Sequence, residues 1–141
     1  MFAAKVFGLG VGLLAAVGCS SNLRAADSIS GDIQVDPAAQ RFHAGQLGKD
    51  TKFVDYRLPS AQSLDTVATP PAGYTPVTPG NGTEGLDGMK TLRIWSGTFS
   101  GKECFVALDK LASAKNYAQQ SLPLDISDGR EQLIRLETYC A

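Results

Sequence analysis

The stretch from Gln132 to Cys140, QLIRLETYC, has the clearest pattern in the chain. Its residues alternate, so that one face of an extended segment carries Ile134, Leu136, Thr138 and Cys140 and the other carries the residues between them. A period of two predicts a β-strand that is half-buried. The strand places a cysteine on the same face as its aliphatic side chains.

Two further runs also predict strands. Lys52–Leu58 alternates in the same way, and Thr91–Phe99 is rich in β-branched and aromatic residues. A shorter strand is expected at Asp32–Val35, and "DG" at Asp128-Gly129 predicts a tight turn before the last strand.

A helix is expected between the last two long strands. "SGKE", Ser100–Glu103, fits a capping box, in which the Ser hydroxyl accepts from the amide three residues on and Glu reaches back. The segment Cys104–Gln120 then places apolar residues at helical spacing, with Cys104 and Leu108 on one stripe. A strand over Cys104–Leu108 followed by a shorter helix is the competing interpretation.

These elements predict an α+β fold. We expect residues 31–141 to form a small single domain, with a short antiparallel sheet, one main helix packed on it and one disulfide. Within it, residues 69–90 are rich in Pro and Gly and predict a loop or linker, with a binding loop as the alternative. Trp95 is expected at a core or edge-strand position, with an exposed contact residue as the alternative, and Tyr74 is a second possible contact residue.

The N-terminus has the parts of an export signal. Lys5 precedes the uncharged run Val6–Val17, which is short for a membrane span, and small residues follow up to Cys19. The sequence Ala16-Val17-Gly18-Cys19 resembles the lipobox of bacterial lipoproteins.

This resemblance implies that residues 1–18 are removed as a signal peptide and that Cys19 is acylated with diacylglycerol. Ser20 after the cysteine implies the outer membrane, with the domain facing the periplasm. Residues 19–30 then form the lipidated N-terminus and a flexible tether. An ordinary leader cut near Ala25-Ala26 and a retained membrane anchor are the alternatives.

The remaining cysteines, Cys104 and Cys140, are the only pair left if Cys19 is acylated. An oxidising compartment then favours a disulfide between them. Two free thiols or a metal pair are the alternatives. The chain has one histidine, His43, which does not lie between the two cysteines, so we predict no metal site and no cofactor.

The sequence argues against several functions. With 13 basic and 14 acidic residues the chain has no basic surplus for nucleic acid. A hydrolase would depend on His43 together with a distant Ser and acid, and no G-x-S-x-G motif is present.

We therefore expect no enzyme and no small-molecule substrate. The expected function is a non-catalytic, lipid-anchored envelope protein that binds or helps assemble another envelope component. The alternative is a periplasmic inhibitor of a lytic enzyme or protease that acts through the Pro/Gly-rich loop. A hydrolase using His43 is the remaining hypothesis.

Overall fold

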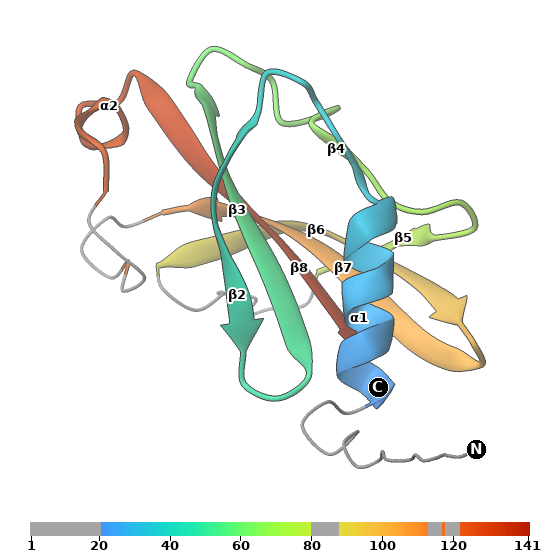
Figure 1. The fold of residues 1–141 in the computed structure, drawn as a ribbon. Helices are drawn as coiled ribbons and strands as arrows, with labels where there is room; N and C mark the ends of the chain where they lie inside the picture. Colours follow the sequence, from blue (N-terminus) through green and yellow to red (C-terminus); the bar gives the residue numbers. More distant parts are fainter. Residues whose placement is uncertain (1–20, 80–87, 113–116, 118–121) are drawn as a thin grey trace, which may run out of the picture.

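The chain folds around one six-stranded sheet, which the computed structural model describes for residues 21–79, 88–112, 117 and 122–141 (Figure 1). The sheet order is β2-β3-β8-β7-β6-β5, and all neighbouring strands in it are antiparallel. A second, two-stranded sheet pairs β1 with β4. The elements in chain order are α1 (Ser21–Asp32), β1 (Gln34–Val35), β2 (Gln40–Leu47), β3 (Thr51–Pro59), β4 (Ala68–Thr69), β5 (Thr75–Val77), β6 (Met89–Phe99), β7 (Lys102–Leu111), α2 (Leu124–Ser127) and β8 (Glu131–Cys140).

The strand β8 lies in the middle of the sheet, between β3 and β7. It runs alongside nine residues of β3, from Thr51 opposite Tyr139 to Pro59 opposite Glu131. The predicted strands at Lys52–Leu58, Thr91–Phe99 and in QLIRLETYC are therefore confirmed. The Asp128-Gly129 turn is confirmed as well, since Gly129 has a φ of 86° and Asp128 accepts the amide hydrogen bond of Arg130.

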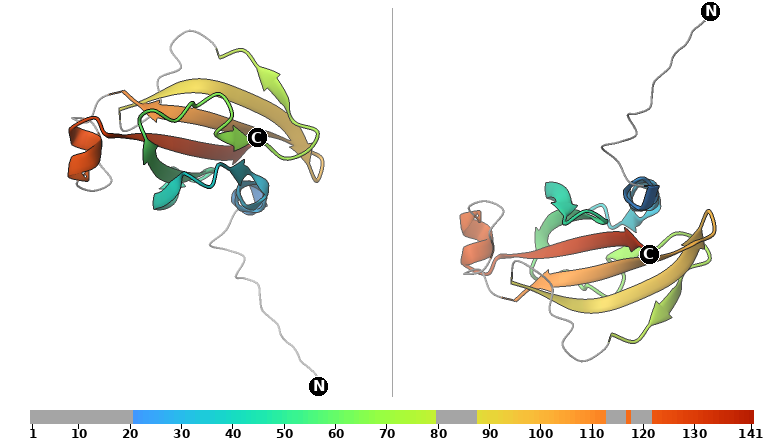
Figure 2. Two further views of the ribbon diagram at one scale, coloured as in Figure 1. Left: turned by 90° about the horizontal axis from the view of Figure 1, so that it is seen from above. Right: turned by 90° about the horizontal axis from the view of Figure 1, so that it is seen from below.

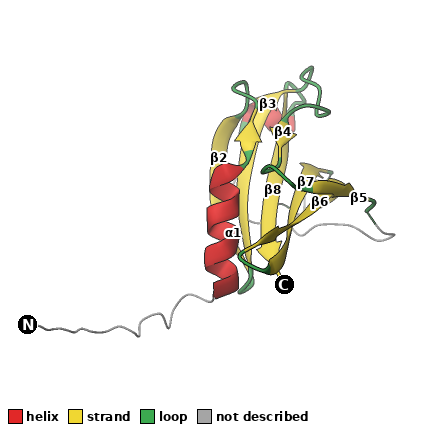
Figure 3. Cartoon of the chain, turned by 90° about the vertical axis from the view of Figure 1, so that its right-hand side faces the viewer, coloured by secondary structure: helices red, strands yellow, loops and turns green. Residues whose placement is uncertain are grey.

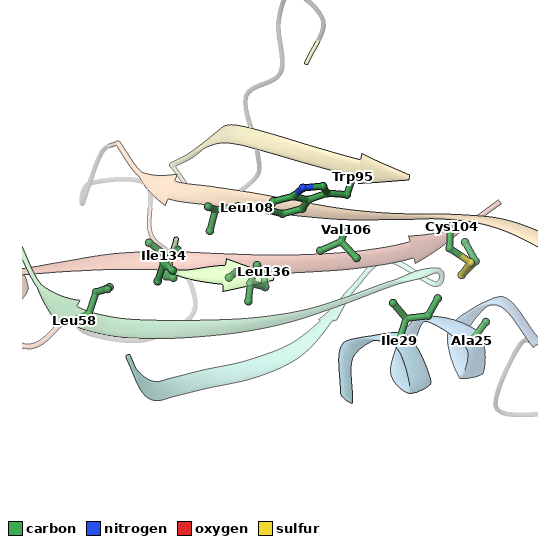
Figure 4. Close-up of a cluster of buried hydrophobic side chains, with 12 residues drawn as sticks. Ala25, Ile29, Leu58, Trp95, Cys104, Val106, Leu108, Ile134 and Leu136 are labelled. Carbon is green, nitrogen blue, oxygen red and sulfur yellow. A yellow bond between two sulfur atoms is a disulfide. The ribbon is translucent and has the colours of Figure 1, made fainter. Parts of the chain in front are cut away.

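Helix α1 covers one face of the sheet, which we call the helix face. The end-on views in Figure 2 place α1 on one side of the curved sheet. Ala25 and Ile29 of the helix join a buried cluster with strand residues such as Val106, Ile134 and Leu136 (Figure 4). This apolar layer is the main core of the protein.

The predicted disulfide is confirmed. Cys104 of β7 and Cys140 of β8 lie directly opposite each other in the strand register and are bonded. Both cysteines are buried in the helix-face core (Figure 4).

The predicted α+β class with one main helix is wrong, because the fold is mostly β. Residues expected in that helix form β7 up to Leu111, and most of residues 113–120 lie outside the described residues. Every second residue of β7 faces the core, namely Cys104, Val106 and Leu108. The residues between them, Phe105 and Ala107, are also apolar, so the sequence does not show a period of two.

The predicted capping box is wrong for a related reason. Ser100 and Gly101 form the turn of the β6–β7 hairpin, with φ angles of 50° and 79°. Two successive positive φ angles suit the twist of a two-residue hairpin. Glu103 then pairs with Thr98 across the hairpin instead of turning back to a helix terminus.

The predicted flexible tether is also wrong where the structure describes it, since residues 21–32 are helix α1. Leu23, Ala26 and Ile29 are buried at a spacing of three, and packing on the sheet stabilises a helix that is polar elsewhere. Residues 1–20, including the predicted signal peptide and Cys19, lie outside the described residues. Among the described residues, no helix is long and apolar enough to span a bilayer.

Candidate functional site

A row of polar side chains crosses the sheet on the face opposite α1, which we call the open face. The strand register aligns His43 of β2, Asp55 of β3, Arg135 of β8, Asp109 of β7 and Thr91 of β6. The three charged residues in the middle of this row are fully buried. Such groups are costly to bury unless they are paired, so their partners decide what the row does.

Asp55 and Arg135 form the centre of the row. Arg135 donates from Nε to Asp55 Oδ1 at 2.7 Å and from Nη2 to Oδ2 at 3.0 Å, which is a two-point ion pair. The Tyr117 hydroxyl donates to the same Oδ2 at 2.7 Å. Burial, and then the hydrogen bond to Asp55, raise the pKa of Tyr117, so it stays a neutral donor.

The guanidinium of Arg135 also lies over an aromatic ring. Its Cζ is 4.2 Å from the centroid of Phe53, which is the arrangement of a cation–π contact. The His43 ring is 5.7 Å from the same Phe53 ring. At its β2 side, the row therefore ends in contacts between aromatic rings.

Asp109 and Glu137 form a second carboxyl pair beside the ion pair. The Thr91 hydroxyl donates to Asp109 Oδ1 at 2.8 Å, while Oδ2 is buried without a hydrogen-bond partner among the described residues. Burial, and then the hydrogen bond to Asp109, raise the pKa of Glu137 to about 9. At neutral pH, Glu137 is therefore protonated and shares its proton with the Asp109 carboxylate.

The polar groups of this row form hydrogen bonds with one another and with neighbouring side chains. Both oxygens of Asp55 accept hydrogen bonds from Arg135 and Tyr117, which leaves Asp55 poorly placed to orient His43. Within the described part of the chain, no hydrogen bond joins His43 to a serine or a carboxylate. A neutral Glu137 can donate a proton, but neither it nor Asp109 lines the grooves described next.

Two open grooves lie elsewhere on the molecule. One, of about 390 Å³, runs between α1 and the β2–β3 pair, where Arg41, Lys52 and Tyr56 face Asp27. Its lining is mostly polar, and the Lys52–Asp27 ion pair at 3.9 Å crosses it. The second, of about 600 Å³, lies beside Tyr74 at the β5–β6 edge.

The side chains of the two possible contact residues, Trp95 and Tyr74, pack mainly against the protein itself. Trp95 is 8% exposed and belongs to the helix-face core, which confirms the expected core position and leaves it no exposed contact surface (Figure 4). Tyr74 is half-buried, and its ring lies over the backbone of Gly97, where a Cβ would come within 2.5 Å. Burial, followed by the Asp32 carboxylate, raises the pKa of Tyr74. Part of the Pro/Gly-rich segment, residues 80–87, lies outside the described residues.

An apolar strip on the open face was not predicted. It consists of Val77 of β5, Leu92 and Ile94 of β6, Phe105 of β7 and Tyr139 of β8. Val77, Leu92 and Tyr139 are 37–39% exposed. The rings of Phe105 and Tyr139 are stacked with centroids 5.0 Å apart.

The register places the two halves of this strip diagonally to each other, because Ile94 lies opposite Ala107 and Phe105 lies opposite Ser96. Val77 pairs with Ile94 on the neighbouring strand, and Phe105 pairs with Tyr139. Leu92 sits at the bulge of β6 and lines a shared groove with Val77 and Ile94. Of the four large exposed hydrophobic residues in the described chain, three belong to this strip.

Sequence reasoning missed the polar row as well as the strip. The sequence did place charged residues in the interior of two predicted strands, and this was the available signal for the row. These residues are Asp55, Arg135 and Glu137. Alternation alone assigns such residues to the solvent side. Their burial follows from strand pairing across the sheet, which the sequence does not display.

Comparisons of the chain with protein-family models, with curated proteins and with solved structures found no match. The site is therefore interpreted from its own geometry.

Proposed function

We propose that this chain is a non-catalytic, lipid-anchored protein of the bacterial envelope that binds or helps to assemble another envelope protein. The anchor in this proposal is Cys19, acylated after removal of residues 1–18, in the outer membrane and facing the periplasm. The binding surface is the apolar strip on the open face.

The apolar strip is the observation that carries the binding part of the proposal. Scattered single exposed hydrophobic residues are normal on a soluble protein, but a contiguous group indicates a contact surface. The strip contains a stacked aromatic pair, Phe105 and Tyr139, and aromatic residues are enriched at the centres of protein interfaces. A partner with a complementary apolar surface fits this chemistry better than a charged ligand does.

The polar row supports a non-catalytic role. A catalytic acid or base needs access to a substrate, whereas Asp55, Asp109 and Arg135 are 0% exposed and bonded to one another or to their neighbours. Such a row fixes the register of four strands and holds the sheet that presents the strip. Its role in the proposal is therefore to support the binding surface.

The anchor is tested by intact-mass analysis and by labelling with a radioactive fatty acid. We expect the mature protein to begin at an acylated Cys19, and Cys19→Ser to remain unlabelled and to leave the membrane fraction. An unmodified N-terminus on the wild-type protein would refute the anchor.

The binding surface is tested with a photo-crosslinking amino acid at Tyr139 in living cells. The matched control carries the same amino acid at Ser28, which is exposed on α1 at the helix face. We expect a defined crosslinked protein from position 139 that is absent from position 28. In the same cells, Val77→Asp is expected to weaken the crosslink, because a charge there opposes burial of the strip. Identical products from both positions would contradict this assignment of the surface.

A further inference from the structure

The short distance between Cys19 and the folded domain has a geometric consequence that goes beyond an anchor. The described part of helix α1 starts at Ser21, two residues after Cys19. Two residues of fully extended chain span about 7 Å at most. An acyl anchor on Cys19 therefore keeps the start of α1 within that distance of its attachment point.

Helix α1 is itself fixed to the sheet. Ala25 and Ile29 pack in the helix-face core with residues of the sheet, and the Asp27 carboxylate lies 3.9 Å from the Lys52 ammonium of β3. The helix therefore cannot serve as a swinging arm without exposing its apolar residues to water. An anchor that fixes the position of the start of α1 therefore also restricts the orientation of the sheet.

The strand register shows which other segments lie at this end of the molecule. Thr51, just after the β2–β3 turn, is opposite Tyr139. The β6–β7 hairpin extends two residue pairs beyond the Cys104–Cys140 bond. Arg24 of α1 lines a small cavity together with Ser100 of that hairpin. Figures 1 and 3 show the start of α1, the β2–β3 turn and the end of β8 at one end of the fold.

The side chains at this end suit a layer of lipid headgroups. Basic residues come from three separate segments, namely Arg24 of α1, Lys49 of the β2–β3 turn and Lys102 at the start of β7. Arg24 and Lys49 are exposed. Asp50 and Glu103 lie among them, so the charge alone gives only weak attraction, and the covalent anchor has to supply most of the binding.

We propose that, in the lipidated protein, this end of the sheet rests on the headgroup layer of the bilayer, with the β2–β3 turn and the β6–β7 hairpin directed toward the lipid. The proposal rests on the acylation of Cys19 proposed above. The other end, which carries α2, then points into the aqueous compartment. The ten residues of β8 extend about 33 Å from the membrane end toward α2, so Leu124 of α2 is held away from the lipid by up to about that length.

The orientation is tested with fluorescent labels on the full-length, lipidated protein in vesicles. Lys49→Cys labels the end that we assign to the membrane, and Leu124→Cys labels α2, whose side chain is 72% exposed. A quencher is attached to the phospholipid headgroups of the same vesicles. We expect strong quenching at position 49 and little at position 124, because such quenching acts over short distances.

A linker variant controls for the short connection. Inserting about ten Gly and Ser residues between Ser20 and Ser21 gives a flexible segment with a mean reach of about 17 Å. This insertion is expected to keep the protein on the vesicles and to remove most of the difference between the two labels.

The outcomes separate the orientation from the anchor. Equal quenching at positions 49 and 124 in the lipidated protein without the linker overturns the orientation and leaves the anchor intact. If the difference in quenching persists unchanged with the linker, the proposed orientation is also overturned, because the short connection to Cys19 then does not orient the domain. A mature protein without lipid on Cys19 refutes the anchor, and the orientation fails with it.

Discussion

Glu137 provides the sharpest test of the polar row, through the variant Glu137→Gln. The carboxyl of Glu137 is largely buried beside Asp109, and its pKa rises from 4.5 to about 9 on folding. In the folded protein it therefore keeps a proton that the unfolded chain releases at neutral pH. A glutamine amide occupies the same volume and donates to Asp109 Oδ2 without taking up a proton.

The sign of the effect follows from this rise. Below pH 4.5 the carboxyl is protonated in both states and its contribution to stability is fully present. As the pH rises toward 9, the unfolded chain loses the proton and the folded chain keeps it, so the wild-type protein loses stability through this window. Counted from 4.5 to pH 7, at about 1.4 kcal/mol per pH unit, the loss is about 3–4 kcal/mol.

Glu137→Gln is therefore expected to be more stable than wild type at neutral pH, by up to about 3–4 kcal/mol, and nearly equal to it in acid. The measurement is urea unfolding of both proteins at several pH values between the two pKa values of Glu137. The matched control is Glu103→Gln, since Glu103 is an exposed residue of β7. This variant removes the same carboxylate from a solvent-exposed position and so controls for the change in net charge.

A single result would refute this reasoning. If Glu137→Gln and wild type lose stability in parallel as the pH rises, Glu137 does not hold a proton in the folded state. Asp109 Oδ2 would then lack the donor that we assign to it. The difference between the two profiles is the quantity to compare, because the other titrating groups are common to both proteins.

Three further predictions concern the sheet and are checked by the same unfolding measurement. Arg135→Met should destabilise the protein by about 3–5 kcal/mol, because it leaves the Asp55 carboxylate buried without its ion-pair partner. Adding Asp55→Leu should recover much of the lost stability. A double variant as unstable as the single one contradicts this account. Replacing Cys104 and Cys140 together by alanine opens a loop with a sequence separation of 36 and should cost up to about 4 kcal/mol, and wild type treated with reductant should match it. Gly97→Ala should cost about 1–3 kcal/mol, because the new methyl group meets the tyrosine ring that lies over it, and unchanged stability would show that this ring moves aside freely.

The sequence by itself determined the strands whose two faces differ. In β8 and β3, apolar and polar residues alternate, because one face of each strand meets the apolar core beneath α1. The cysteine pairing was also predictable, since two cysteines remain once Cys19 is assigned to the lipid. Gly129 marked its turn because a positive φ favours glycine.

The tertiary structure decided the features that depend on pairing between distant segments. The strand β7 was read as a helix because it lies between two other strands and carries apolar residues on both faces, which obscures its period. Helix α1 has Leu23 and Ile29 as its only large apolar residues, which is too little apolar surface to predict a helix before the sheet is present.

The polar row shows the same limit at the level of single residues. Asp55 and Arg135 are 80 residues apart in the chain, yet they are direct neighbours in the sheet. A charge in a strand predicts exposure until its partner is known, because burial becomes affordable only when strand pairing brings the opposite charge to hydrogen-bond distance. The alternation of each strand is a local property of the sequence, whereas the register that joins these charges is a property of the whole sheet.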